Sequence, residues 1–123
     1  MKIEKLNQMK VLLVEDEIEL SSMLENAIGE YFFTFKVASN GKEGLELFKE
    51  IKPDLVITDI NMPNMNGIEM SKEIRKTNPN LPIIILSAFS QKDYLLNAID
   101  LSVTKYLIKP FDPDELLESI SII

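Results

Sequence analysis

The pattern of hydrophobic and polar residues along the chain changes its period several times. Four short runs, rich in apolar and β-branched residues, predict strands over residues 10–14, 54–58, 82–87 and 104–108. A fifth run, residues 33–38, predicts a strand whose alternating sides are less fully apolar. After each run, apolar residues recur at helical spacing, which predicts helices over residues 17–31, 40–52, 67–77, 91–101 and 112–123. The chain therefore alternates strand and helix about five times.

Local signals support two of these helices. In the first, the residues expected on the buried face are Leu20, Leu24, Ala27, Ile28 and Tyr31. The last has Asp112 at the N-cap, Pro113 at the first helical position and Glu115 three residues after the cap. These residue types are favoured at a helix start, so the predicted helix begins here.

The alternation predicts the fold. Strands that are apolar along their whole length fit a parallel sheet buried on both faces, and right-handed crossovers place helices on both sides of it. We expect a single-domain, flavodoxin-like, doubly wound α/β sandwich, whose five-stranded parallel sheet has the order 2-1-3-4-5. Residues 1–8 would form a short N-terminal extension and residues 9–123 the core.

Composition excludes several classes of function. The 123 residues include no cysteine and no histidine, which removes disulfides, thiolate or histidine zinc sites and cysteine or Ser–His nucleophiles. The net charge of −7 disfavours direct nucleic-acid binding, which depends on clustered basic residues. No apolar run is long enough to span a bilayer, and the first ten residues do not resemble a signal peptide. We expect a cytoplasmic protein without a membrane partner.

Polar residues of several kinds follow the central strands. In this fold the carboxyl ends of the strands form one mouth of the sheet, where ligands bind. The residues that the sequence places there are Glu15, Asp16 and Glu17 after the first strand, Asp59 and Asn61 after the third, Ser87 at the end of the fourth and Lys109 after the fifth. Singly, each fits an ordinary turn, cap or surface residue. Unrelated turn, cap and surface roles do not readily explain why each central strand ends in a polar residue of a different kind.

The chemistry open to this set is narrow. Two carboxylates about 4 Å apart repel by roughly 4 kcal/mol at an effective dielectric near 20, and the cleft would hold Glu15, Asp16 and Asp59. Lys109 offsets one charge, and a hard divalent cation, Mg²⁺ or alternatively Mn²⁺, suits the remaining oxygen ligands. A metal, a lysine and a hydroxyl facing a carboxylate are arranged for phosphoryl transfer, in which the carboxylate can become an aspartyl-phosphate.

Four motifs resemble those of the receiver domains of two-component response regulators. "VLLVEDE" is similar to the first-strand acidic motif of that family, and "VITDINMPNMNG" to its phospho-acceptor segment. "IIILSA" is similar to the strand that carries the switch hydroxyl, and "KYLIKPF" to the last strand. The departures are small, since Glu15 replaces a commoner Asp, and Asn64 and Asn66 replace Gly and Asp. Asn tolerates positive φ, so the loop can still turn.

The resemblance implies a role for each residue. Asp59 would accept the phosphoryl group, and the metal would be held by Glu15, Asp16, Asp59 and the backbone carbonyl of Asn61. Ser87 and Lys109 would contact the phosphoryl group, and Tyr106 would be the aromatic switch partner of Ser87. Asn61 and Phe89 would tune self-dephosphorylation, and the Lys109–Pro110 bond would be cis.

The resemblance also implies partners. A sensor histidine kinase or a histidine phosphotransfer protein would supply the phosphoryl group, and an output domain or protein, not identified by the sequence, would read the switch. The face built by the fourth helix, last strand and last helix would change, and a homodimer that forms on phosphorylation is compatible with this. Such a domain is a signalling switch, which catalyses only its own phosphorylation and dephosphorylation.

Three alternatives compete with this interpretation. A phosphatase with an Asp nucleophile would need an Asp-x-Asp set after its first strand, and "VEDE" lacks it. A nucleotide or flavin binder would need a Gly-rich or Ser/Thr-rich phosphate loop there, where the acidic residues would repel phosphate. A degenerate receiver that acts only as an interaction module is disfavoured by the intact set of Glu15, Asp16, Asp59, Ser87 and Lys109.

Overall fold

A single parallel sheet forms the centre of the protein. The computed structural model describes residues 3–88 and 101–123. Its strands are β1 (Lys10–Val14), β2 (Thr34–Ala38), β3 (Leu55–Asp59), β4 (Ile83–Ala88) and β5 (Lys105–Lys109), in the order β2-β1-β3-β4-β5. All four neighbouring pairs are parallel. The predicted flavodoxin-like topology is confirmed.

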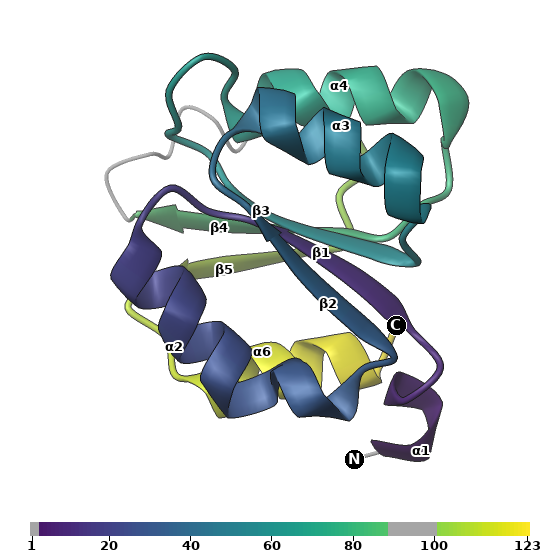
Figure 1. Ribbon diagram of the computed structural model, residues 1–123, viewed down its shortest axis with the longest axis vertical. Helices are drawn as coiled ribbons and strands as arrows, with labels where there is room; N and C mark the ends of the chain where they lie inside the picture. Colours follow the sequence, from purple (N-terminus) through teal and green to yellow (C-terminus); the bar gives the residue numbers. More distant parts are fainter. Residues whose placement is uncertain (1–2, 89–100) are drawn as a thin grey trace.

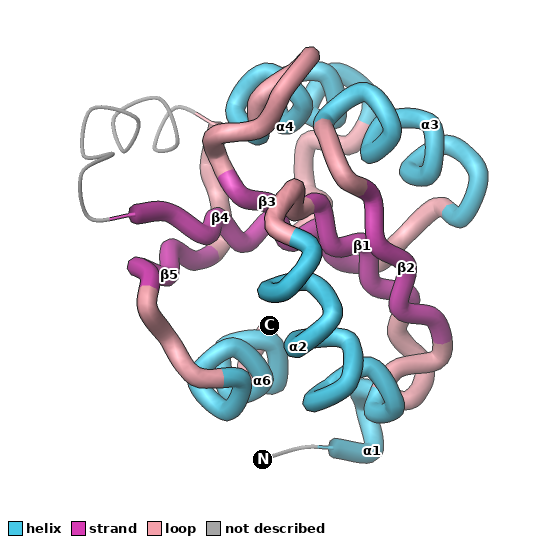
Figure 2. The backbone as a smooth tube through the Cα atoms, turned by 60° about the vertical axis from the view of Figure 1, so that its left-hand side comes forward, coloured by secondary structure: helices cyan, strands magenta, loops and turns pink. Residues whose placement is uncertain are grey.

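Helices cover both faces of the sheet. In Figure 1, α3 (Gly41–Ile51) and α4 (Gly67–Thr77) lie on one face, and α2 (Ile18–Ile28) and α6 (Pro113–Ser121) on the other. A short helix, α1 (Ile3–Leu6), contacts α6 near the two chain ends (Figure 2). In the described part of the chain, no helix is both long and apolar enough to cross a membrane.

The core has two halves, one on each face of the sheet. Successive residues of a strand point to opposite faces, so the apolar runs supply both halves. In β1, Val11 and Leu13 pack with α2 and α6, whereas Leu12 and Val14 pack with α3 and α4. Burial on both faces is the physical reason why the central strands β1, β3 and β4 are predominantly apolar, whereas the edge strands β2 and β5 are only partly buried.

The N-terminal segment also contributes to this core. Leu6 of α1 is fully buried and packs with Met9 and the α6 side of the sheet. From the sequence, this segment was predicted only to be an extension, because it is too short for a helical repeat of apolar residues to be recognised. The division into residues 1–8 and 9–123 stays a prediction.

The boundaries of several elements differ from those expected. The strands predicted at 54–58, 82–87 and 104–108 each begin and end one residue later. The first long helix ends at Ile28 and is followed by a 3-10 turn, η1 (Gly29–Tyr31), which breaks the helical phase. Tyr31, which lies in this turn, and Ala27, which lies in α2 itself, are both exposed, so their expected burial was wrong. Leu24 and Ile28 are buried as expected. The helix predicted over 91–101 lies almost entirely outside the described residues.

Candidate functional site

Three charged side chains from three strands converge at the carboxyl edge of the sheet. The N–H of Glu15 donates to the carbonyl of Ala38 at 2.9 Å, so Glu15 continues the β1 pairing by one residue. Asp59 is the last residue of β3 and Lys109 the last of β5. The two carboxylates are buried, with 1% and 5% of Glu15 and Asp59 exposed, and Lys109 is half-buried.

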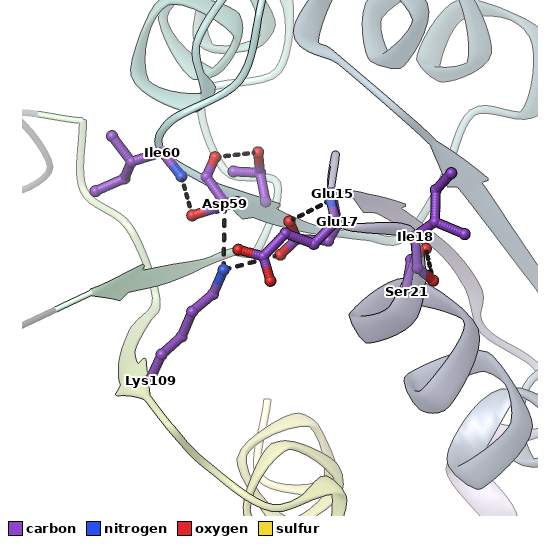
Figure 3. Close-up of polar contacts among 8 residues, drawn as sticks. Glu15, Glu17, Ile18, Ser21, Asp59, Ile60 and Lys109 are labelled. Atoms are coloured by element: carbon purple, nitrogen blue, oxygen red, sulfur yellow. Dashed lines mark hydrogen bonds and ion pairs between the residues drawn. The ribbon is translucent and has the colours of Figure 1, made fainter.

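The ammonium group of Lys109 lies between the two buried carboxylates, as Figure 3 shows. Its Nζ is 3.1 Å from Oε1 of Glu15 and 3.2 Å from Oδ2 of Asp59. The other oxygens accept backbone hydrogen bonds: Oε2 of Glu15 from the N–H of Glu17 at 3.1 Å, and Oδ1 of Asp59 from the N–H of Ile60 at 2.7 Å. Each carboxylate is thus oriented by one backbone donor and one shared cation.

Burial dominates the titration of Glu15. It raises the pKa of this carboxyl, and the charge of Asp59 raises it further, while the Glu17 N–H and Lys109 lower it, so that the pKa is about 7. Burial also lowers the pKa of Lys109, but attraction to Asp59 and Glu15 outweighs it, and the pKa of Lys109 is raised overall. Lys109 therefore stays cationic, while Glu15 is poised to exchange a proton near neutral pH.

Asp16 completes a cluster suited to a cation. One carboxylate oxygen from each of Glu15, Asp16 and Asp59 lies within 4.8 Å of the other two. Asp16 is exposed and lines a depression together with Asn61 of the loop after β3. The donors are all hard oxygens and at least one side of the cluster faces solvent, which fits Mg²⁺ with several retained waters. One lysine supplies a single positive charge against three carboxylates, so the donor set fits a divalent ion.

A close backbone approach behind Asp59 depends on Gly67. A Cβ atom at Gly67 would lie 1.9 Å from the carbonyl oxygen of Asp59 and 2.8 Å from Oγ1 of Thr58. The Thr58 hydroxyl donates to the same carbonyl at 2.8 Å. From the sequence, Gly67 was expected only to be the first residue of the helix over 67–77. The sequence signal for this approach was a glycine directly after the turn-rich loop.

Ser87 and Tyr106 are neighbours on adjoining strands. Ser87 is 2% exposed and follows Leu86, which pairs with Asp59 in the sheet. The Tyr106 ring is half-buried, and its buried hydroxyl has no hydrogen-bond partner among residues 3–88 and 101–123. Burial raises the pKa of Tyr106 and the Ser87 hydroxyl lowers it in part, although the two hydroxyls are not in hydrogen-bonding geometry. Tyr106 therefore already lies inward.

Two backbone features expected from the resemblance are present. The Lys109–Pro110 peptide bond is cis, and Asn64 has a φ of 70°. Asn66 caps α4, because its side chain accepts from the N–H of Glu69 and the Glu69 side chain accepts from the N–H of Asn66. Phe89 lies outside the described residues, so its predicted place at the rim of the site stays a prediction.

Comparison with known proteins gives one consistent family. A family model described as "Response regulator receiver domain" matches residues 11–121. The chemotaxis protein CheY of Thermotoga maritima is 39% identical over 91% of this chain and 94% of its own length. The regulatory protein AtoC of Escherichia coli is 38% identical over 87% of this chain, but the chain spans only 23% of that protein.

A solved structure agrees with the same assignment. The chemotaxis response regulator CheY4 of Vibrio cholerae superposes with a TM-score of 0.85 and 28% identity, covering 94% of this chain and 98% of that one. The relatives thus include both short chains of similar length and much longer regulators.

Proposed function

The chain belongs to the response regulator receiver domain family, whose members are phosphorylation-based signalling switches, and we propose that Asp59 is its phospho-acceptor. The observation that carries the proposal is the position of Asp59. It is the last residue of a central strand, it is buried, and its carboxylate lies 3.2 Å from the ammonium of Lys109. A carboxylate oriented in this way is ready to attack phosphorus, and a cation stands beside the charge that would form.

The transfer step uses the carboxylate as nucleophile. A carboxylate oxygen of Asp59 attacks the phosphorus of a phosphohistidine on a sensor histidine kinase or a histidine phosphotransfer protein. The phosphorus–nitrogen bond breaks, and its electron pair stays with the departing imidazole. The Ile60 N–H holds one carboxylate oxygen at 2.7 Å, which limits rotation of the nucleophile. Lys109 and the Ser87 hydroxyl then contact the phosphoryl oxygens.

The acidic cluster would hold Mg²⁺, with Mn²⁺ as the alternative ion. We assign Glu15, Asp16, Asp59 and the backbone carbonyl of Asn61 as the ligands, and the three carboxylates already approach one another within 4.8 Å. When bound, the ion neutralises negative charge on the incoming phosphoryl group. Glu15 must be ionised to serve as a ligand, so its pKa of about 7 couples metal binding to proton release.

Phosphorylation would be read through Ser87 and Tyr106. The Tyr106 hydroxyl is already buried beside Ser87, so we infer that phosphorylation raises the population of this inward position and does not create it. The face that changes comprises the predicted helix 91–101, β5 and α6. A downstream protein or domain, or a second copy of the chain, would bind this face. We place the protein in the cytoplasm, with no direct contact to nucleic acid.

The lifetime of the phosphorylated state would depend on Asn61 and Phe89. Asn61 is exposed beside Asp16, where its amide can orient a water molecule. The apolar Phe89 has no group to do so and, at the position implied by the resemblance, would exclude solvent. We therefore propose a moderately long-lived phospho-aspartate, and faster decay in Phe89→Glu. Equal or slower decay in that variant would remove Phe89 from this role.

The test of the acceptor compares two aspartates at opposite ends of β3. Acetyl phosphate with Mg²⁺ should add one phosphoryl group to the wild type, detected by intact mass. Asp59→Asn should remain unmodified, whereas Asp54→Asn should be modified normally, because Asp54 lies at the other edge of the sheet. Modification of Asp59→Asn at the wild-type level would place the acceptor elsewhere. No modification of the wild type would favour a degenerate receiver that acts only as an interaction module.

A further inference from the structure

The loop between β3 and α4 is seated on the start of a neighbouring helix. This loop, residues 60–66, contains Asn61. The backbone N–H of Gly41, the first residue of α3, donates to the carbonyl oxygen of Met65 at 3.1 Å. The Met65 side chain packs against the apolar cluster on the α3 and α4 face of the sheet. The loop is thus held from outside by a helix far from it in the sequence.

Gly41 leaves no room for a side chain at this contact. A Cβ atom there would lie 2.4 Å from the carbonyl oxygen of Met65 and 2.9 Å from both Cβ and Cγ of the same residue. The nearest atom is backbone, so it cannot move aside as a flexible side chain can. A substituted residue 41 would have to displace the loop or the first turn of α3.

The first turn of α3 is itself oriented by a cap. The Asn40 side chain accepts from the N–H of Glu43 at 2.9 Å, and the Asn40 carbonyl accepts from the N–H of Gly44 at 2.8 Å. Capping fixes the direction in which the Gly41 N–H points, and this N–H has no acceptor within the helix. The Asn40 cap therefore orients the Gly41 N–H, which donates to the Met65 carbonyl.

The loop also closes on itself near the acidic cluster. The N–H of Gly67 donates to the carbonyl of Ile60 at 2.9 Å, and the N–H of Met65 donates to the carbonyl of Pro63 at 2.8 Å. In the sequence, Asn61 lies between Ile60 and Pro63, whose carbonyls accept these two bonds. The N–H of Ile60 donates to the Asp59 carboxylate. Short hydrogen bonds therefore connect the Met65 segment of the loop to Ile60, the residue between Asp59 and Asn61.

We propose that Gly41, supported by the Asn40 cap, is a positioning residue for the Mg²⁺ site. Its N–H and its missing side chain seat the Met65 carbonyl, and this fixes the position of the loop that carries Asn61, which lines the same depression as Asp16. The inference rests on the proposed function, because it assumes that the loop supplies a metal ligand. Residues that orient metal ligands without touching the ion commonly change metal affinity by 10- to 100-fold when mutated.

The chain offers a matched control for packing in the same helix. Gly44 lies one turn further along α3, where a Cβ atom would lie 2.7 Å from Sδ of Met70 and 3.0 Å from Cγ2 of Val14. Both neighbours are side-chain atoms of the core and neither belongs to the loop. Gly44→Ala therefore disturbs how α3 packs without touching the seat of Met65. Gly29→Ala is the second control, because its nearest contact would be an ordinary 3.6 Å.

The experiment measures Mg²⁺ affinity and stability in the same variants. Mg²⁺ is titrated into the wild type, Gly41→Ala, Gly44→Ala and Gly29→Ala, followed by amide chemical shifts, and each variant is unfolded in urea without metal. Gly41→Ala should raise the Kd for Mg²⁺ about tenfold and shift the metal-free amide signals of residues 61–66. Gly44→Ala should lower the urea midpoint but leave the Kd and those signals near wild-type values.

The outcomes separate this inference from the proposed function. If the wild type binds Mg²⁺ and Gly41→Ala binds it equally well, the positioning role is overturned and the metal site stands. If both glycine variants weaken Mg²⁺ equally, Gly41 acts through packing alone, which also overturns it. A wild type that does not bind Mg²⁺ would refute the proposed metal site and the inference together.

A second variant serves if Gly41→Ala does not fold. Asn40→Ala removes the cap without adding bulk, and it should weaken Mg²⁺ binding about threefold by loosening the first turn of α3. Its control is Ser39→Ala, which removes a side-chain hydrogen bond to Glu43 and leaves the cap in place. Equal Mg²⁺ affinity in Asn40→Ala and Ser39→Ala would overturn the positioning role.

Discussion

Asp54 and Asp59 stand at opposite ends of the same strand and have opposite environments. Asp54 is exposed just before β3, and its side chain and N–H make two backbone hydrogen bonds to Lys10, each at 2.8 Å. Asp59 is buried at the last residue of β3 and shares a lysine ammonium with a second buried carboxylate. The same residue type hydrogen-bonds to a neighbouring strand end at one end of β3 and belongs to a buried cluster of charged side chains at the other.

The difference comes from which charges each end of the sheet brings together. At the Asp54 end, the carboxylate is exposed to solvent and accepts a hydrogen bond from the backbone N–H of Lys10. At the Asp59 end, the charges are buried and interact with one another more strongly, so removing one group changes the electrostatic environment of the others. Variants at the two ends should therefore differ in stability, in pH dependence and in signalling.

The largest difference should come from removing the shared cation. Lys109→Met keeps much of the side-chain stem but leaves Glu15 and Asp59 without their cation, which should lower the free energy of unfolding at pH 8 by about 2–4 kcal/mol. Lys10→Met, at the Asp54 end, should change it by less than about 0.5 kcal/mol. Urea unfolding without metal measures both values. Equal losses would show that the cluster at the Asp59 end is not electrostatically special.

The next difference should appear in the pH dependence. Folding raises the pKa of Glu15 from 4.5 to about 7, so the folded protein holds a proton that the unfolded chain releases between these values. The stability from this proton is fully present below pH 4.5 and is lost as the pH rises through 7. Relative to Glu15→Gln, the wild type should lose on the order of 2 kcal/mol between pH 5 and pH 8 without metal.

Parallel stability curves for the wild type and Glu15→Gln would contradict that shift. Saturating Mg²⁺ supplies an internal check. The ion favours ionised Glu15, so it should offset the loss at pH 8 in the wild type and have less effect in Glu15→Gln.

A smaller effect is expected at the opposite end of β3. Asp54→Ala removes the acceptor for the Lys10 N–H and should cost about 1 kcal/mol. Asp54→Asn keeps an acceptor oxygen at the same place and should recover most of this. Neither variant should change phosphorylation of Asp59, which intact mass can follow. A loss of phosphorylation in Asp54→Asn would show that the two ends of the strand are coupled.

The smallest effect on stability at the Asp59 end is expected for Lys109→Arg. This variant keeps the positive charge and changes the shape of the cation, so it tests which of the two matters for signalling. The cation is retained, so unfolding should change by no more than about 1 kcal/mol, and Asp59 should still accept a phosphoryl group. A planar guanidinium cannot copy the contact of a compact ammonium, so the response of the β5 amide signals to phosphorylation should be weaker. A full wild-type response of those signals would count against this role of Lys109.

The element order and topology were predictable from the sequence because the central strands are predominantly apolar and segments with helical periodicity separate the strands. The residues at the strand ends were predicted less well. Asp59 and Lys109 were placed after their strands, because polarity was taken to end the pairing. Backbone hydrogen bonding between strands does not depend on side-chain charge, and both residues are paired with the neighbouring strand. The α4 cap was also missed, although Asn66 and Glu69 have the spacing of a capping box.

The local pattern was enough to predict that one edge of the sheet carries Glu15, Asp16, Asp59, Ser87 and Lys109. The carboxyl ends of parallel strands meet at the same edge, because the strands share their direction. Packing between distant segments was needed for the rest. The raised pKa of Glu15, the bridging position of Lys109, the seat of Met65 on Gly41 and the burial of Leu6 depend on distances of a few ångströms between segments far apart in the chain. Periodicity carries no information on such distances, since it reports which face a residue occupies and not what stands opposite it.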